Sequence, residues 1–174
     1  MIRVFPAPRI SLMSNLLDAN FTNLLTSQEY LRILIIAVGN YSRADDGVGP
    51  YIALRLKQSS KLSVIDAGSR PENIIDQAVK LLPQRIIFID AADFGGFPGE
   101  LRLIDSEHIP EASLSTHSIP LPVVSHILQK DTQAQIYFIG IQPQSVAQQE
   151  GLSGEVKSAA DVLIKHINAE FKDA

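Results

Sequence analysis

The stretch ILIIAVGNYSRADDGVGP, residues 33–50, decides the fold because an apolar strand runs directly into a glycine-rich turn that carries two acids. Glycine lets the backbone turn sharply at a strand end, where a residue with a Cβ atom is often strained. The adjacent carboxylates Asp45 and Asp46 follow at a fixed distance from the strand. Open α/β sheets bind their ligands at this place, outside the carboxyl ends of the strands. The stretch therefore predicts an α/β fold with a site after its first strand.

Short apolar runs alternate with helical patterns from residue 32 onward, which is typical of a mostly parallel sheet covered by helices. The expected strands are about 33–38, 62–65, 85–89, 100–104 and 135–141, and the expected helices about 48–57, 72–82, 121–130 and 154–171. The link between the third and fourth strands is too short for a crossover helix, so we expect the fourth strand to run antiparallel to the third. We predict a three-layer α/β/α sandwich with a mostly parallel, five-stranded twisted sheet.

The first residues of the chain do not follow this pattern. Residues 1–31 contain scattered apolar residues among prolines and asparagines, without the apolar core of a signal peptide. We interpret residues 1–31 as an N-terminal extension outside the core, with an amphipathic helix near 14–25, and residues 32–174 as the functional domain. Met13 is an alternative start that the sequence does not decide.

Composition limits the classes of function. The chain has 174 residues, 45% of them hydrophobic, which suits one compact domain. It has no cysteine, which excludes a thiol nucleophile and a cysteine-based metal centre and fits a cytoplasmic location. A net charge of −4 without a basic cluster argues against nucleic-acid binding, and we expect no membrane partner. A monomer is expected because no long apolar surface stripe stands out.

Acids and one histidine are the chemically informative residues. Asp46 follows the first strand, Asp90 follows the third, and His117 precedes the helix expected at 121–130. Two carboxylates and an imidazole suit a divalent ion such as nickel, zinc, iron or cobalt, with positions left for substrate. Such an ion supports hydrolysis. A nucleophile elbow, a His-Glu-x-x-His helix and a phosphate-binding loop are absent from the sequence.

When each of these residues is taken alone, a structural role explains it about as well as a role in a metal site. Asp46 fits a helix cap, Asp90 a turn residue and His117 an ordinary surface or structural histidine. Three further acids lie close to the strand ends, namely Asp45, Asp66 and Asp93. Each either forms hydrogen bonds to the metal ligands or stabilises a turn. The residues alone leave both interpretations open.

The ordered set of motifs resembles the nickel–iron hydrogenase maturation endopeptidases. The resemblance runs from residue 33 to the last helix, and its SRPEN and GIQP segments look most like the branch that serves formate-hydrogenlyase-type hydrogenases. The motifs are GN at 39–40, DDGVGP at 45–50, DAGSRPEN at 66–73, DAAD at 90–93, PGE at 98–100, THSIPL at 116–121 and GIQP at 140–143. The extension before residue 32 is not part of the family pattern.

This resemblance implies a function and a ligand set. Members of the family remove the C-terminal extension of a hydrogenase large-subunit precursor after nickel has been inserted. Their metal ligands fall on Asp46, Asp90 and His117, which are therefore the expected catalytic and nickel-binding residues. The nickel is expected to come with the precursor, which is the expected partner. We further expect Asp45, Asp66 and Asp93 to orient these ligands through hydrogen bonds.

Two alternatives remain. Peptidyl-tRNA hydrolase has a related architecture and a Gly-Asn after its first strand, as at 39–40, but it places a histidine where this chain has Asp45 and Asp46. It also needs a basic surface for RNA, which the net charge of −4 opposes. The second alternative is a nickel-binding docking module for hydrogenase assembly that has the fold and lacks turnover.

Overall fold

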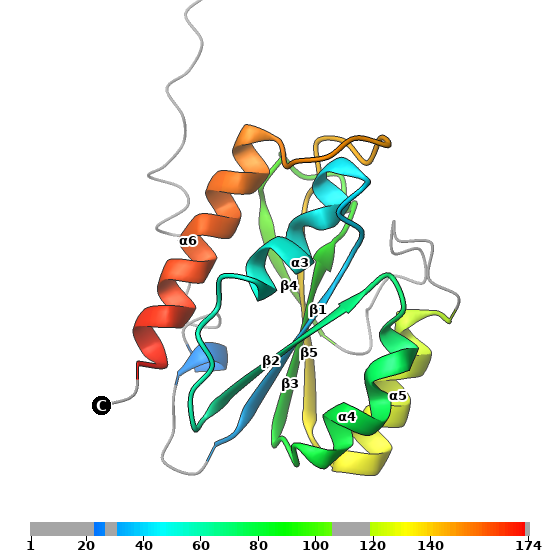
Figure 1. Cartoon of the computed structure of the whole chain (residues 1–174), viewed down its shortest axis with the longest axis vertical. Coiled ribbons are helices and arrows are strands. Elements are labelled where there is room, and N and C mark those ends of the chain that lie inside the picture. Colours follow the sequence, from blue (N-terminus) through cyan, green and yellow to red (C-terminus); the bar gives the residue numbers. More distant parts are fainter. Residues whose placement is uncertain (1–22, 27–30, 106–118, 173–174) are drawn as a thin grey trace, which may run out of the picture.

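The computed structural model describes residues 23–26, 31–105 and 119–172 (Figure 1). His117, the start at Met13 and most of the helix expected at 14–25 lie outside these residues. Within the described residues no helix is long and apolar enough to cross a membrane.

A five-stranded sheet forms the centre of the molecule, in the order β2-β1-β3-β5-β4. Strands β1, β2, β3 and β5 are parallel neighbours, and β4 runs antiparallel to β5. The bounds are β1 Ile33–Val38, β2 Leu62–Gly68, β3 Arg85–Ala91, β4 Leu101–Asp105 and β5 Gln135–Ile141. All six residues of β1 are buried, because this strand lies inside the sheet with helices on both faces.

Helices cover both faces of the sheet (Figure 1). On one face lie the 3-10 turn η1 (Ala44–Gly47) with α3 (Val48–Ala53), and the long helix α6 (Gly154–Glu170). On the other lie η2 (Pro71–Ile74) with α4 (Ile75–Lys80), and α5 (Leu121–Thr132). Alternate residues of the buried strands supply the two apolar layers: Ile33 and Ile35 pack toward α3 and α6, whereas Leu34 and Ile36 pack toward α4 and α5. The predicted three-layer α/β/α sandwich is confirmed.

Three details differ from the predicted architecture. The fourth strand has the expected direction, but its neighbour is β5 rather than β3, because β5 inserts between them. The first helix ends at Ala53, short of residue 57, and is preceded by η1, which contains both acids of the turn. The second begins as the 3-10 turn η2 and becomes α-helical only at Ile75.

Part of the N-terminal segment belongs to the core, contrary to the expectation that residues 1–31 lie outside it. Leu24 and Leu25 are 4% and 0% exposed and pack in the apolar layer beneath α3 and α6. The guanidinium group of Arg85, at the start of β3, donates hydrogen bonds to the carbonyl oxygens of Asn23 and Leu24. These contacts tie residues 23–25 to the amino end of the sheet.

Candidate functional site at the carboxyl edge of the sheet

The turn after β1 places Asp46 against the strand end. Gly39 has φ +143°, and a Cβ atom there would lie 1.9 Å from the carbonyl oxygen of Asp46. The same oxygen accepts a hydrogen bond from the Asn40 amide at 3.0 Å, and the Asp46 amide donates to Arg43 at 3.0 Å. Glycine is therefore required for this close approach. Asp46 is 1% exposed, so its carboxylate is held within the protein.

Gly49 brings the start of α3 onto the ends of two strands at once. A Cβ atom at Gly49 would lie 2.1 Å from the Val38 carbonyl oxygen and 2.8 Å from that of Ile89. Val38 ends β1, and Ile89 immediately precedes Asp90 in β3. The turn that carries Asp46 is thus seated where β1 and β3 end side by side.

Asp90 is the second buried acid at this edge. It is 0% exposed and pairs with Gly140 of β5 in the parallel register of the sheet. One of its carboxylate oxygens, Oδ1, accepts the Ala91 amide at 2.8 Å. Because β1 and β3 are adjacent and parallel, Asp46 and Asp90 lie at the same edge, as the sequence predicted, and metal binding by these carboxylates stays a prediction.

Asp45 is completely buried and faces a different partner. Its carboxylate accepts four hydrogen bonds from the segment between β5 and α6. The donors are the amides of Gln144, Ser145 and Ser153 and the Ser153 hydroxyl, at 2.7–3.0 Å. The turn after β1 and the loop before α6 therefore lie side by side at the top of Figure 1. These bonds show a tether between segments, and the predicted action of Asp45 on the metal ligands stays a prediction.

Asp66 and Asp93 lie on the surface at the same edge. Asp66 accepts the Gly68 amide at 2.9 Å, which closes a turn after β2. Partial burial raises the pKa of the Tyr41 hydroxyl, and the charge of Asp66 raises it further, so Asp66 lies near the turn that follows β1. Asp93 accepts hydrogen bonds from the Gln142 side chain and the Gly95 amide, both at 3.1 Å. These two bonds, the Gln142 bond foremost, lower the pKa of Asp93.

The donor set fits a divalent cation as far as the structure describes it. Asp46 and Asp90 contribute two buried carboxylates from neighbouring strand ends, and His117 lies outside the described residues. No group of three or more His, Cys, Asp or Glu side chains is placed to hold a metal within the described residues. The complete ligand set therefore depends on His117, which stands four residues before Leu121, the first residue of α5, in the THSIPL segment of the sequence.

Gln142 and Ser153 contribute to this edge although the sequence gives no signal for their roles. Gln142 is 7% exposed at a strand end, so its side-chain amide has to form hydrogen bonds within the protein. Ser153 directly precedes α6, where serine is common as a helix cap. Its hydroxyl instead donates to Asp45, and sequence spacing carries no signal for that contact across 108 positions.

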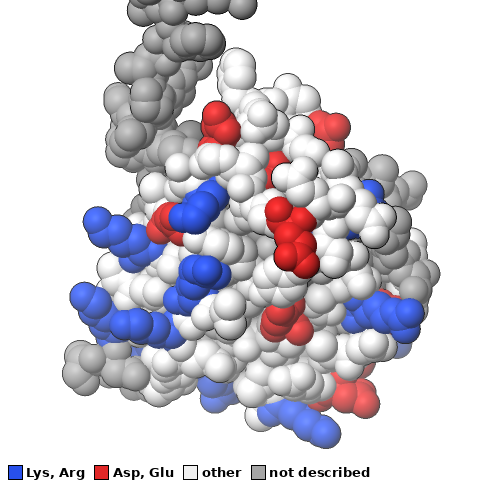
Figure 2. Space-filling model, turned by 45° about the horizontal axis from the view of Figure 1, so that its top comes forward, with Lys and Arg blue, Asp and Glu red and all other residues white. Residues whose placement is uncertain are grey.

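The face at the carboxyl edge is not basic. In Figure 2, which brings the top of Figure 1 forward, acidic side chains lie across the middle of the visible face and most lysines and arginines lie toward its sides and lower part. This distribution opposes a phosphate-backbone partner on that face.

The fold and the buried acids define an α/β protein with a candidate site at the edge of a mostly parallel sheet. A family model described as "Hydrogenase maturation protease" (HycI) matches residues 48–170. The chain belongs to the hydrogenase maturation protease family, which supports a peptidase and favours this class over peptidyl-tRNA hydrolase.

Individual relatives agree with this assignment. The chain is 35% identical over 137 residues to the "Hydrogenase 3 maturation protease" of Escherichia coli (strain K12), covering 77% of this chain and 87% of the relative. It is 31% identical over 143 residues to a putative hydrogenase maturation protease of Methanocaldococcus jannaschii, covering 76% and 84%. The crystal structure of the maturation protease HycI from Thermococcus kodakarensis matches with a TM-score of 0.79 at 28% identity, covering 89% of this chain and all of that one.

Proposed function

We propose that this protein is an endopeptidase that removes the C-terminal extension of a nickel–iron hydrogenase large-subunit precursor after nickel insertion. The observation that carries the proposal is the placement of Asp46 and Asp90, two buried carboxylates at the ends of adjacent strands, in a chain of the hydrogenase maturation protease family. The precursor is the substrate, and the nickel belongs to it.

Asp46, Asp90 and His117 are the residues proposed to hold the nickel of the precursor. Two carboxylates buried at one sheet edge concentrate negative charge in a region of low dielectric. Their attraction for a divalent cation is therefore stronger than it would be in bulk water. An imidazole as third ligand matches the preference of nickel for mixed nitrogen and oxygen donors. Nickel held in this way is a Lewis acid that polarises a carbonyl oxygen.

The protein's own contribution is position. Gly39 and Gly49 fix the backbone of Asp46 against the two strand ends, so the carboxylate is presented without rearrangement. When the nickel of a precursor meets Asp46 and Asp90, the nearby peptide bond is fixed relative to the same edge of the sheet. The peptide bond and the nickel are then held in a defined orientation, which removes the entropy cost of bringing them together by chance. Cleavage then depends on assembly of the metal centre, because the ligands of the protease recognise nickel already seated in the precursor.

The proposal is tested with purified precursor, prepared with and without nickel, and intact mass as the readout. We expect wild-type protein to shorten only the nickel-loaded precursor, and Asp46→Asn and Asp90→Asn to remain folded and shorten neither. Equal shortening of the nickel-free precursor would contradict the role given to nickel. Nickel-dependent binding of the precursor without any shortening would identify the docking module instead.

A further inference from the structure

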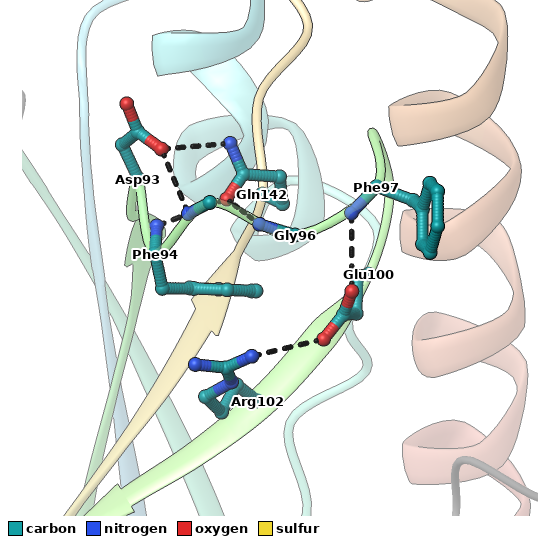
Figure 3. A network of polar contacts seen from close by, with 8 residues as sticks. Asp93, Phe94, Gly96, Phe97, Glu100, Arg102 and Gln142 are labelled. Atoms are coloured by element: carbon teal, nitrogen blue, oxygen red, sulfur yellow. Dashed lines mark hydrogen bonds and ion pairs between the residues drawn. The ribbon is translucent and has the colours of Figure 1, made fainter.

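The side chain of Gln142 forms four hydrogen bonds, three to the loop between β3 and β4 (Figure 3) and one at its own strand end. Its Oε1 accepts the amides of Phe94 at 2.9 Å and Gly96 at 3.1 Å. Its Nε2 donates to Asp93 at 3.1 Å and to the Pro143 carbonyl oxygen at 3.3 Å. All the donor and acceptor positions of the amide are thus used, which fixes its orientation.

The rest of the loop, residues 93–100, is fixed as well. The Gln142 amide donates to the Glu100 carbonyl oxygen at 2.9 Å, and the Gly99 amide donates to the Gln142 carbonyl oxygen at 2.8 Å. The Phe97 amide donates to Glu100 Oε2 at 3.1 Å. Gly99 has φ +79°, and a Cβ atom there would lie 2.6 Å from the Glu155 carbonyl oxygen at the start of α6. The loop is therefore a rigid surface element.

The two phenylalanines of this loop have different surroundings. Arg102 covers the ring of Phe94, with its guanidinium carbon 4.0 Å from the ring centroid. Phe97 is 72% exposed, and its ring points away from the side chains gathered around Gln142 (Figure 3). The loop begins three residues after Asp90, at the edge that the scissile peptide has to reach. A fixed backbone with an exposed aromatic ring has little conformational freedom to lose when it binds a partner.

We infer that the 93–100 loop contacts the hydrogenase precursor through Phe97 and that Gln142 positions the loop for this contact. The inference rests on the proposed function, because the precursor is the occupant that has to approach Asp90. Gln142 acts through the loop and touches no reacting atom, so it is a positioning residue.

Glutamine and glutamate have nearly the same shape, but only glutamine has N–H donors at the Nε2 position. In Gln142→Glu, the carboxylate still accepts the amides of Phe94 and Gly96, but it meets the carboxylate of Asp93 where the wild type has a hydrogen bond. The other charged side chains of this region, Glu100 and Arg102, pair with each other at 3.2 Å. In the double variant Gln142→Glu/Asp93→Asn, the asparagine amide donates to the new carboxylate and restores one hydrogen bond with reversed direction.

Single-turnover cleavage of nickel-loaded precursor at increasing protease concentration separates the apparent Kd from the maximal rate. We expect Phe97→Ala to raise the apparent Kd about three- to tenfold while the maximal rate stays within about twofold. Gln142→Glu is expected to raise the apparent Kd at least as much. In the double variant Gln142→Glu/Asp93→Asn, the apparent Kd is expected to return part of the way to the wild-type value. Leu82→Ala is the matched control: Leu82 is 63% exposed and lies at the opposite edge, before β3, so its apparent Kd is expected to equal that of wild type.

The outcomes are distinct from those of the proposed function. If wild-type protein does not shorten the precursor, the proposed function fails first. If it does, and Phe97→Ala binds the precursor as tightly as wild type and Leu82→Ala do, the loop is not the contact and the inference is wrong. Thermal unfolding identifies a Gln142→Glu protein that is unfolded, and Phe97→Ala then decides alone, because it removes an exposed ring.

Discussion

Asp45 and Ser153, which are 108 positions apart in the chain, are joined by two hydrogen bonds: the Ser153 amide donates to Oδ1 at 2.7 Å and its hydroxyl to Oδ2 at 3.0 Å. This pair connects the turn that carries Asp46 to the first residue before α6. The amides of Ala44 and Gln149 add backbone hydrogen bonds between the same two segments. The position of the turn that carries Asp46 thus depends on the segment that precedes α6, far along the sequence.

Removal of the Asp45 carboxylate is expected to destabilise the fold. Asp45→Ala leaves four partly buried donors without their acceptor, and we expect the free energy of unfolding to fall by about 2–4 kcal/mol. Ser153→Ala removes only the hydroxyl bond, so a loss of about 1 kcal/mol is expected. Urea unfolding of both variants measures the difference, and equal losses would show that the hydroxyl bond carries the whole effect.

Alanine at Gly49 is expected to displace the turn that presents Asp46. The added Cβ atom meets the backbone carbonyl oxygens of Val38 and Ile89, which lie in the sheet and cannot move aside. We expect a loss of about 3 kcal/mol or more in the free energy of unfolding, together with loss of processing. Gly154→Ala is the control, since nothing lies within 4 Å of the added atom and the site is helical. A Gly49→Ala protein as stable as this control would refute the packing argument.

The contact between α3 and α6 is expected to depend on pH. Hydrogen bonds from Lys157 at 2.8 Å and Tyr51 at 2.7 Å lower the pKa of Asp161. A carboxylate whose pKa is lower in the folded state adds stability above its unfolded pKa of about 3.9 and loses it as pH falls through the folded value.

Because Asp161 is largely exposed, Asp161→Asn is expected to cost only a few tenths to about 1 kcal/mol at neutral pH. The difference from wild type should shrink below about pH 4. Denaturant titrations at pH 7 and pH 3 provide the comparison. A difference that grows in acid would mean that another group accounts for the effect.

The N-terminal segment contributes to stability through residues 24 and 25. Leu25 is fully buried, so Leu25→Ala is expected to lower the free energy of unfolding by about 2–4 kcal/mol. Leu82→Ala, at an exposed site, is expected to change it by less than about 0.5 kcal/mol. If Leu25→Ala proved as mild as Leu82→Ala, the segment would not be part of the core in solution.

The sequence predicted the sheet well because its strands are uninterrupted apolar runs. Ile33–Val38 and Gln135–Ile141 were predicted to the residue, and the direction of β4 followed from a connection too short for a helix. The partner of β4 was not predictable in this way, because the insertion of β5 between β3 and β4 depends on a pairing distant in sequence. The 3-10 starts of the first two helices reflect turn geometry rather than apolar periodicity.

The candidate site was predictable in part for the same reason. Asp46 and Asp90 follow apolar strands directly, so strand adjacency alone brings them to one edge. The roles of Asp45 and Gln142 arise from long-range hydrogen bonds, which leave no periodic pattern in the sequence. Leu24 and Leu25 were missed because two apolar residues beside a polar segment do not distinguish a core anchor from an extension.

The most direct test of the central claim is the mass of a nickel-loaded large-subunit precursor after incubation with wild-type protein, with Asp90→Ala and with His117→Ala. We expect a shortened precursor and a released C-terminal peptide with wild type, no change with either variant, and no change for the nickel-free precursor. Full shortening by Asp90→Ala would contradict the assignment of the site.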